Sequence, residues 1–366
     1  MFNNIYKDKK VLITGHTGFK GTWLTIWLLK LDANVVGISK DIPTTPSMFE
    51  ELKIEGKIKH YKEDIRDLYK ITEIISLEKP EFLFHLAAQP IVSTSYSDPI
   101  ETISSNVMGT ANILEALKTS NHKCKAIIIT SDKAYDNVEQ VWGYKEDDKM
   151  GGKDIYSGSK GAAELIIKSY YHSFLKNKNS NIKLAIGRAG NVIGGGDWAK
   201  DRIVVDCMEA WSKKKSVEIR SPQATRPWQH VLEPLSGYLN LGQALYEDNS
   251  LHGEAFNFGP RAEQNHTVKK LLKDLSIYWN FKDINDAFSV TDNIPFDEAG
   301  LLKLNCDKAL FYLKWQANME YKDTIRFTSS WYYDFYKKDV NILDKTLDQI
   351  REYEIMAKLK GLLWTE

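Results

Sequence analysis

The sequence predicts an α/β fold in which a doubly wound parallel sheet carries a smaller α/β part that binds substrate. Three observations support this prediction. Apolar segments of strand length alternate with longer helical segments along the first half of the chain. A glycine-rich turn joins the first strand segment to the first helical segment. Residues 126–129 contain only Ala and Ile, which is typical of a strand buried on both faces of a sheet.

The size and composition of the chain exclude several classes of protein. Its 366 residues suffice for one large or two interlocked domains. The 49 basic and 49 acidic residues cancel, so no overall field favours nucleic acid or acidic membrane. The three cysteines include no CxxC pair, which argues against a disulfide scaffold or a metal site and favours the reducing cytoplasm. No apolar run approaches the ~20 residues that span a bilayer, and the first residues lack a signal peptide's apolar segment.

The first strand and helix are joined by a glycine turn. Residues 11–14 form the strand, residues 15–21 read Gly-His-Thr-Gly-Phe-Lys-Gly, and an apolar helix follows. Gly15 permits a tight turn, Gly18 lets the backbone approach a pyrophosphate, and Gly21 lets the helix pack closely on the sheet. The phosphates would lie against the helix N-terminus, beside Thr17 and Phe19. This arrangement predicts a Rossmann-type dinucleotide site.

The second strand, residues 34–38, leaves the choice of dinucleotide open. An acidic residue that binds the adenosine ribose usually ends this strand. Here Ser39 and Lys40 precede the first acid, Asp41, so this rule does not decide between NAD and NADP.

The third and fourth strands complete the predicted cofactor site. Residues 60–64 form a weaker strand, after which Asp64 and Ile65 would close over the adenine ring; a solvated loop end is the alternative for Asp64. Residues 82–90 form the fourth strand and its exit. There Leu86, Ala87 and Ala88 leave room for the cofactor, and Gln89 would face the substrate.

A reactive cluster follows the fifth strand. Ser131, Asp132 and Lys133 stand at its carboxyl end, where ligands of parallel sheets gather. Tyr156 and Lys160 are one helical turn apart and share a helix face. An ammonium beside a phenol lowers the phenol pKa from about 10, which makes Tyr156 a candidate general base. Because three other tyrosines have a Lys at the same spacing, the position after the fifth strand singles out this pair.

Two helices suggest an assembly of subunits. The helix expected at about 98–119 and the one after Tyr156 both carry apolar residues on more than one face. The excess would cover the sheet and leave a stripe for a second subunit in a homodimer or higher homo-oligomer. A thicker monomeric core is the alternative.

The composition of the sequence and the length of its segments change after the sixth strand, residues 182–186. Short segments, glycines beside Trp and polar loops replace the long periodic elements, as expected for backbone that surrounds a ligand. We therefore expect a dinucleotide-binding domain at 1–188 with a return segment at about 229–260. The substrate-binding domain would comprise about 189–228 and 261–366. The charged tail after Lys337 predicts a surface helix.

Polar residues of the second part are candidates for substrate contact. Asn191 and Arg226 suit a nucleotide diphosphate, and Arg202 and His230 are second choices. A structural salt bridge or loop hydrogen bond is an equal alternative for each of these four. Trp198 would stack on the nucleobase or lie in the core.

Together these motifs resemble the extended short-chain dehydrogenase/reductase family, from Val11 to about Trp315. The glycine turn is similar to its cofactor fingerprint, residues 85–88 to its fourth-strand signature, and Tyr156 with Lys160 to its catalytic pair. Ser131-Asp132 resembles the sugar-nucleotide 4,6-dehydratases within that family. Lys133, where Glu is more usual, and the strings at 15–21, 189–198 and 226–231 resemble the branch that acts on CDP-glucose.

The resemblance implies NAD as cofactor and conversion of CDP-glucose to CDP-4-keto-6-deoxyglucose, without net redox change, in deoxysugar and polysaccharide biosynthesis. Tyr156 would take the proton of the 4-hydroxyl while Lys160 steadies the phenolate and binds the cofactor ribose. Ser131 would hydrogen-bond the 4-oxygen, and Asp132 would protonate the departing 6-hydroxyl. Lys133 would remove the C5 proton or stabilise the enolate as an ammonium; a surface lysine is the alternative.

Three other functions remain open at this point. A 4-epimerase of the same fold needs Tyr156 and Lys160 but no acid at Asp132. A dehydratase that acts on another nucleotide sugar would retain all three residues. A non-catalytic dinucleotide sensor that binds a partner protein would need none of them.

Overall fold

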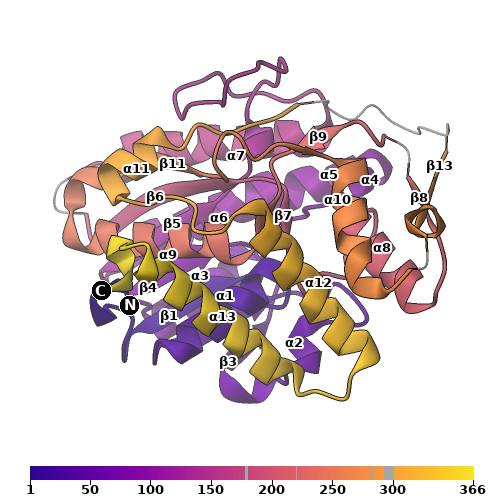
Figure 1. Cartoon of the computed structure of the whole chain (residues 1–366). Helices are drawn as coiled ribbons and strands as arrows, with labels where there is room; N and C mark the ends of the chain where they lie inside the picture. The colour runs from indigo at the N-terminus through magenta and orange to yellow at the C-terminus, as the bar shows by residue number, and fades with distance from the viewer. Residues whose placement is uncertain (178–179, 220, 282, 292–300) are drawn as a thin grey trace.

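A parallel sheet forms the centre of the molecule (Figure 1). The computed structural model describes residues 1–177, 180–219, 221–281, 283–291 and 301–366. Within these residues the sheet has seven strands in the order β11-β6-β5-β4-β1-β2-β3. Their bounds are β1 Lys10–Thr14, β2 Asn34–Ser39, β3 Lys59–Lys62, β4 Phe82–His85, β5 Cys124–Ile129, β6 Ile182–Ala189 and β11 Ala255–Phe258. The predicted Rossmann-type doubly wound fold is confirmed.

Helices cover both faces of the sheet. Successive side chains of a strand point to opposite faces, and apolar residues at both sets of positions are buried. Leu12 and Leu83 pack in one apolar cluster, whereas Val11 and Phe84 pack in the other. The first cluster contains residues of α3 (Leu68–Glu78), α6 (Gly109–Thr119) and α7 (Ile155–Tyr170). The second contains residues of α1 (Phe19–Lys30), α9 (Leu232–Glu247), α12 (Tyr321–Lys337) and α13 (Ile342–Leu359). The sheet is therefore a middle layer, with α12 and α13 outermost on one side (Figure 1).

The order of the strands places a crevice beside β1. This strand pairs with β2 on one side and with β4 on the other, so the connections leave it in opposite directions. Ligands of open α/β sheets bind at the carboxyl ends of such a pair of strands. The turn after β1 is tight: Gly15 has φ +77°, and a Cβ there would lie 2.7 Å from the backbone nitrogen of Ala87. Only glycine fits this position.

The helix predicted at 98–119 contains a π-turn. It comprises α5 (Pro99–Ile103), the π-turn η3 (Ser104–Met108) and α6. Inside the π-turn, the Asn106 amide accepts a hydrogen bond from the Gln89 backbone N–H at 2.8 Å and donates to Ser159 Oγ at 2.9 Å. The helix thereby ties the exit of β4 to α7. A short helix, α4 (Val92–Ser97), precedes it, and α7 itself ends in the π-turn η5 (Tyr171–Leu175).

The second half of the chain contributes to both parts of the molecule. Within residues 229–260, strand β11 joins the edge of the central sheet, and helix α9 belongs to the layer of helices that covers one face of it. The smaller part contains α8 (Ile203–Ser212), α10 (Val268–Ser276) and three pairs of short strands: β7 (Val192–Ile193) with β10 (Gln229–His230), β9 (Thr225–Arg226) with β12 (His266–Thr267), and β8 (Val217–Ile219) with β13 (Phe288–Val290). Two short helices, α2 (Met48–Glu51) and α11 (Asp307–Leu313), complete the described α-helices. Residues 292–300, inside the predicted second domain, lie outside the described residues.

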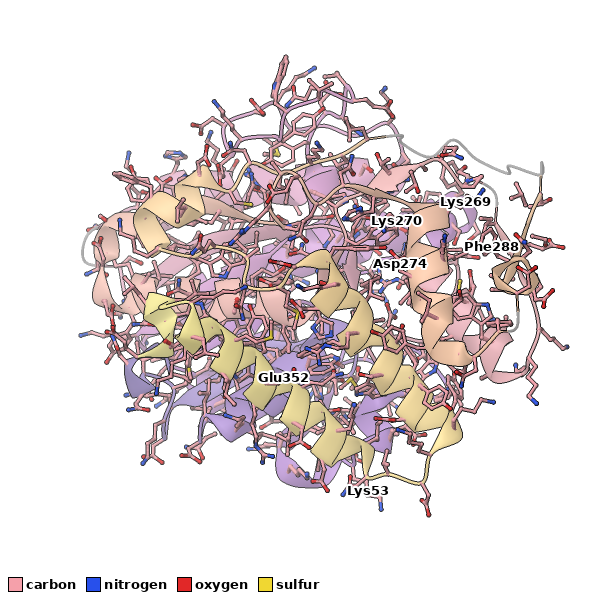
Figure 2. The ribbon with its side chains drawn as sticks, viewed as in Figure 1. Lys53, Lys269, Lys270, Asp274, Phe288 and Glu352 are labelled. Carbon is pink, nitrogen blue, oxygen red and sulfur yellow. The ribbon has the colours of Figure 1, made fainter. Side chains whose placement is uncertain are left out.

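The predicted C-terminal surface helix is α13, and one side of it is buried. Glu354 accepts a hydrogen bond from Trp27 Nε1 at 3.0 Å and pairs with Lys30 at 2.6 Å, which joins α13 to α1. Glu352 lies on the outer side of the helix (Figure 2). It pairs with Arg326 of α12 at 2.7 Å. No helix in the described ranges is both long and apolar enough to cross a membrane.

Candidate active site

A cavity of about 1190 Å³ opens at the carboxyl ends of the central strands and extends into the smaller part. A pocket for one small ligand usually measures about 300–1,000 Å³, so this cavity has room for more than one. Most of the predicted site residues lie on its wall: Gly15, Thr17, Gly18, Phe19, Gly21, Asp64, Ile65, Leu86, Ala87, Ala88, Gln89, Ser131, Asp132, Lys133, Tyr156, Lys160, Asn191, Arg202 and Arg226. The fold therefore gathers residues from five strand ends around one space.

The glycine turn fits the diphosphate of a dinucleotide. Helix α1 begins at Phe19, and its N-cap, Gly18, supplies no side-chain hydrogen bond to the first turn. The free N–H groups of such a helix end attract phosphate. The turn is held beside the end of β2, because the Thr17 hydroxyl donates to the Asp41 carbonyl at 2.8 Å. In the described part of the chain, no three His, Cys, Asp or Glu side chains are grouped to hold a metal ion.

Tyr156 and Lys160 project into the cavity from the start of α7. The helix begins there because Asp154, its N-cap, accepts a hydrogen bond from the Ser157 backbone N–H at 2.9 Å. Both side chains are only 7% exposed. Burial lowers the pKa of Lys160 to about 8, although the nearby Glu164 carboxylate raises it.

The predicted lowering of the Tyr156 pKa is wrong for this structure. Burial raises the pKa of Tyr156 to about 12, and the charge of Asp132 raises it further. A hydrogen bond with Ser131 lowers it by less. Desolvation of the phenolate thus outweighs the groups that favour it. Asp132 and Tyr156 line the same cavity, so both lie at the carboxyl ends of the strands.

Ser131 and Asp132 occupy the turn after β5. The Ser131 hydroxyl donates to Asp132 Oδ1 at 3.0 Å and accepts from the Lys133 backbone N–H at 3.2 Å. Asp132 is 3% exposed. A Cβ at Gly190 would lie 1.8 Å from Asp132 Oδ2, so the loop after β6 needs glycine to admit this carboxylate. Lys133 is half-buried on the wall of the same cavity.

Lys20 is a cavity residue that the sequence analysis did not select. It lies in the first turn of α1, half-buried, and its ammonium shares the cavity with Asp132, Lys160 and Arg202. Burial lowers the pKa of Lys20 to about 8, and the positive charge of Arg202 lowers it further. The sequence signal that could have identified Lys20 is a charged residue between Phe19 and Gly21, at the start of a helix whose next residues are mostly apolar.

The predicted substrate residues separate into two groups. Asn191, Arg202 and Arg226 line the cavity; Arg202 pairs there with Asp197. Trp198 and His230 are absent from the described cavity wall. Trp198 packs against Trp331 and Phe335, and its Nε1 donates to the Tyr336 hydroxyl at 2.9 Å. His230 is fully buried between Trp23 and Phe327. Both therefore belong to the aromatic core.

Known proteins resemble this chain over most of its length. Residues 12–328 match the family model described as GDP-mannose 4,6-dehydratase. The chain is 45% identical over 334 residues to a CDP-glucose 4,6-dehydratase of Salmonella typhimurium. The aligned region covers 90% of this chain and 92% of the relative. It is 26% identical to a CDP-paratose 2-epimerase of Salmonella typhi, over 88% of this chain and 98% of the relative.

Solved structures show the same fold. A dTDP-glucose 4,6-dehydratase from Streptomyces venezuelae, with NAD and TYD bound, superposes with a TM-score of 0.76. The match covers 89% of this chain and 97% of that one. At 17% identity this similarity concerns the fold alone.

Proposed function

The chain belongs to the GDP-mannose 4,6-dehydratase family, and on that premise we propose that it removes water from CDP-glucose to give CDP-4-keto-6-deoxyglucose. The observation that carries the proposal is that Ser131, Asp132, Lys133, Tyr156 and Lys160 share one cavity with the glycine turn. The choice of CDP-glucose is supported by the 45% identical relative of that name.

The first step removes one hydrogen from C4 of the glucose, as hydride, and the proton of the 4-hydroxyl. NAD held at the glycine turn would supply the hydride acceptor, a positive ring charge that favours the Tyr156 phenolate, and the hydride that returns to C6. Tyr156 accepts the proton of the 4-hydroxyl, and Lys160 stabilises the phenolate as an ammonium. Ser131, on the same cavity wall as Tyr156, would hold the 4-oxygen. The product of this step is a ketone at C4.

The second step eliminates water across C5 and C6. The C4 ketone acidifies the C5 proton, and Lys133 is placed on the cavity wall to remove it or to stabilise the enolate. Asp132 gives a proton to the 6-hydroxyl as the C6–O bond breaks. The lost C5 proton and 6-hydroxyl together make one water. Return of hydride to C6 and of a proton to C5 completes the 4-keto-6-deoxy sugar.

The proposal is tested by incubating the protein with NAD and, separately, with CDP-, dTDP-, GDP- and UDP-glucose. Mass spectrometry of the products should show loss of one water from CDP-glucose and no change in the others. A CDP-hexose of unchanged mass but altered configuration would identify a 4-epimerase instead. Loss of water from another nucleotide sugar would transfer the proposal to that substrate.

We also propose that the protein is a homodimer. Apolar side chains are exposed on α5, η3, α7 and η5, elements that contact one another in turn: Ile100, Ile103, Met108, Leu165 and Phe174. Such a contiguous run of helices with exposed apolar residues is typical of a subunit interface.

A cytoplasmic location is our further proposal, with the product used for deoxysugars of surface polysaccharide such as lipopolysaccharide O-antigen. The three cysteines are all free thiols, as a reducing compartment requires. A 4-keto sugar nucleotide also needs a further reduction or amination before transfer, which fits a biosynthetic intermediate.

A further inference from the structure

The end of β2 carries a cation where a dinucleotide ribose would lie. An acid at this position selects the free 2′-hydroxyl of NAD, whereas a basic residue nearby accommodates the 2′-phosphate of NADP. Ser39 ends the strand and Lys40 follows it on the cavity wall. The sequence alone, with Lys40 ahead of the first acid, leaves the choice between NAD and NADP open.

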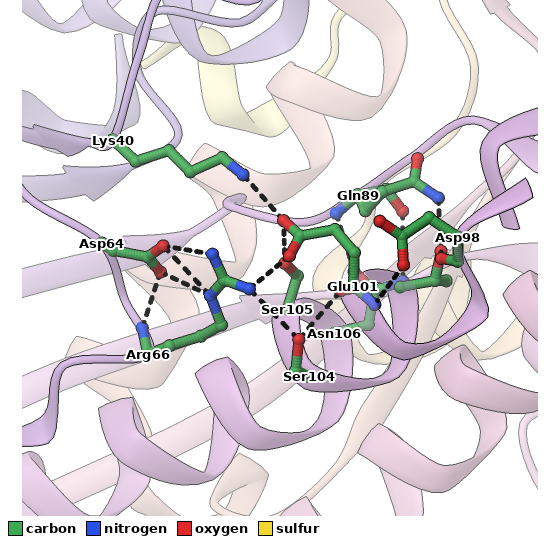
Figure 3. A network of polar contacts seen from close by, with 10 residues as sticks. Lys40, Asp64, Arg66, Gln89, Asp98, Glu101, Ser104, Ser105 and Asn106 are labelled. Carbon is green, nitrogen blue, oxygen red and sulfur yellow. Dashed lines mark hydrogen bonds and ion pairs between the residues drawn. The ribbon is translucent and has the colours of Figure 1, made fainter.

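The ammonium of Lys40 is paired with a carboxylate. Its Nζ lies 2.8 Å from Oε1 of Glu101, on α5 (Figure 3). Glu101 is held in place at both ends: its backbone N–H donates to the Asp98 carboxylate at 3.0 Å, and its side chain accepts from Ser105 Oγ at 3.2 Å. The partner of Lys40 is thus built into the first turn of a helix.

The same carboxylate also binds a second cation. Arg66, after β3, contacts Glu101 through Nη1 and pairs with Asp64 through Nη2 at 2.6 Å and through Nε at 3.0 Å (Figure 3). Lys40 and Arg66 carry two positive charges, and Glu101 and Asp64 carry two negative charges, so the cluster is neutral. A 2′-phosphate would have to compete with carboxylates for both cations.

Asp41, the first acidic residue after β2, lies on the cavity wall. The Thr17 hydroxyl donates to the backbone carbonyl of Asp41, which keeps this residue beside the glycine turn. Ser39 does not replace it, because its hydroxyl hydrogen-bonds His16 Nδ1 at 3.0 Å and the Thr17 N–H at 3.4 Å. Asp41 is exposed and free to accept from ribose hydroxyls and to repel a phosphate.

We propose that Glu101 is a positioning residue for cofactor choice: by pairing with Lys40 and Arg66 it keeps the ribose site selective for NAD over NADP. The proposal rests on the proposed function only in taking a nicotinamide dinucleotide as the cofactor. It assigns selectivity to a helix that follows β4 in the chain rather than to the residue that ends β2.

The test is direct binding of NAD and of NADP to the full chain by titration calorimetry at low ionic strength. Wild type should bind NAD more tightly. Glu101→Gln frees Lys40 and one nitrogen of Arg66, which keeps Asp64 as a partner; one charge-assisted contact to a phosphate should then raise the affinity for NADP relative to NAD about tenfold or more. Glu63→Gln is the control, because it removes a carboxylate next to Asp64 in the sequence that pairs with neither cation in the described contacts. It should leave the ratio within about threefold.

Two further variants protect the test from a folding defect. Lys40→Met in the wild-type background should not change the ratio, because Lys40 is already neutralised. The double variant Glu101→Gln with Lys40→Met should lose most of the NADP affinity that Glu101→Gln alone gains. An unchanged ratio in a Glu101→Gln protein of wild-type melting temperature would overturn the inference, as would a fall in NADP binding caused by Lys40→Met alone. Wild type that binds NADP more tightly than NAD would also overturn it. If wild type binds neither dinucleotide, the proposed function itself fails.

Discussion

Burial sets the charge of the residue that stabilises the phenolate. The pKa of Lys160 is lowered to about 8 from an ordinary value of 10.5, because burial disfavours its ammonium. Between these two pH values the unfolded chain binds more protons than the folded one, so Lys160 makes folding more favourable as the pH rises through that window.

Activity should show the opposite trend. Because the proposed role requires the ammonium, and because bound NAD would hold Tyr156 as the phenolate, kcat/KM should fall about tenfold for each pH unit above about 8. Lys160→Arg, which stays charged throughout, should have lower activity at pH 7 but lose this decline. A wild-type profile that stays flat to pH 10 would contradict the role.

The carboxyl of Asp132 should matter for elimination rather than for oxidation. In Asp132→Asn, dehydration should fall about 10²-fold or more, while the first step still reduces the cofactor. The absorbance of reduced nicotinamide should therefore accumulate after one turnover, which wild type does not show. Product formation at the wild-type rate would remove Asp132 from the chemistry.

Lys133 is tested by exchange of the C5 proton with deuterated solvent. If Lys133 is the base, Lys133→Ala should lower exchange about 10²-fold, and Lys133→Glu should recover part of it because a carboxylate is also a base. Lys145→Ala, at an exposed position of the following loop, is the control. Unchanged exchange in both Lys133 variants would exclude a chemical role for this residue.

Sequence reasoning located the residues that stand next to predicted strand ends. Ser131, Asp132 and Tyr156 lie on the cavity because strand ends and helix starts are set by local pattern. Trp198 and His230 could not be assigned in that way, since their burial depends on α12, more than 90 residues later in the chain. The pKa of Tyr156 likewise depends on packing that no local pattern contains.

At the scale of elements, a buried ion pair positions the catalytic helix. Glu164 lies one turn after Lys160 and binds Arg188 of β6 in bidentate fashion, at 2.8 and 2.9 Å. Both side chains are 4% exposed. Arg188 also donates to the Tyr135 hydroxyl at 2.7 Å. These contacts set the rotation of α7 and hence the direction of Tyr156.

Breaking this pair should therefore cost both stability and activity. Arg188→Met leaves a buried carboxylate unpaired and should lower the free energy of unfolding by about 3–5 kcal/mol. Glu164→Gln with Arg188→Met removes both charges and should recover part of that loss. Urea denaturation measures both. Equal stability of wild type and Arg188→Met would show that the pair does not hold the helix.

The elements with strong periodicity were predictable, and their interruptions were not. The glycine turn, α1 and the buried strands follow from residue type and spacing. The π-turn Ser104–Met108 could not be predicted, because a single widened turn hardly changes the apolar spacing of the helix that contains it. The buried side of α13 could not be predicted from composition, because charged residues dominate this helix; Tyr353 packs there against Trp27 of α1.

At the scale of the whole molecule, two parts of different character enclose one cavity. The seven-stranded sheet is predictable from alternating strand and helix segments. The two- and three-residue strand pairs of the smaller part are not, since strands of that length have no periodicity and are defined by contacts distant in sequence.

The proposed dimer can be tested on the whole protein by light scattering after gel filtration. Leu165→Glu with Phe174→Glu places charges on the exposed apolar run and should convert a dimer to a monomer. Leu77→Glu is the control, because Leu77 is also exposed but lies on α3. A wild-type mass of 42.0 kDa would contradict the dimer.

The most direct measurement is the fate of deuterium placed on C4 of CDP-glucose. If one cavity performs oxidation, elimination and reduction on a bound sugar, the deuterium should appear at C6 of the 4-keto-6-deoxy product, with no net reduction of NAD. Magnetic resonance of the product reports its position. Deuterium found in released reduced cofactor, or still at C4 of an unchanged or epimerised hexose, would contradict the account.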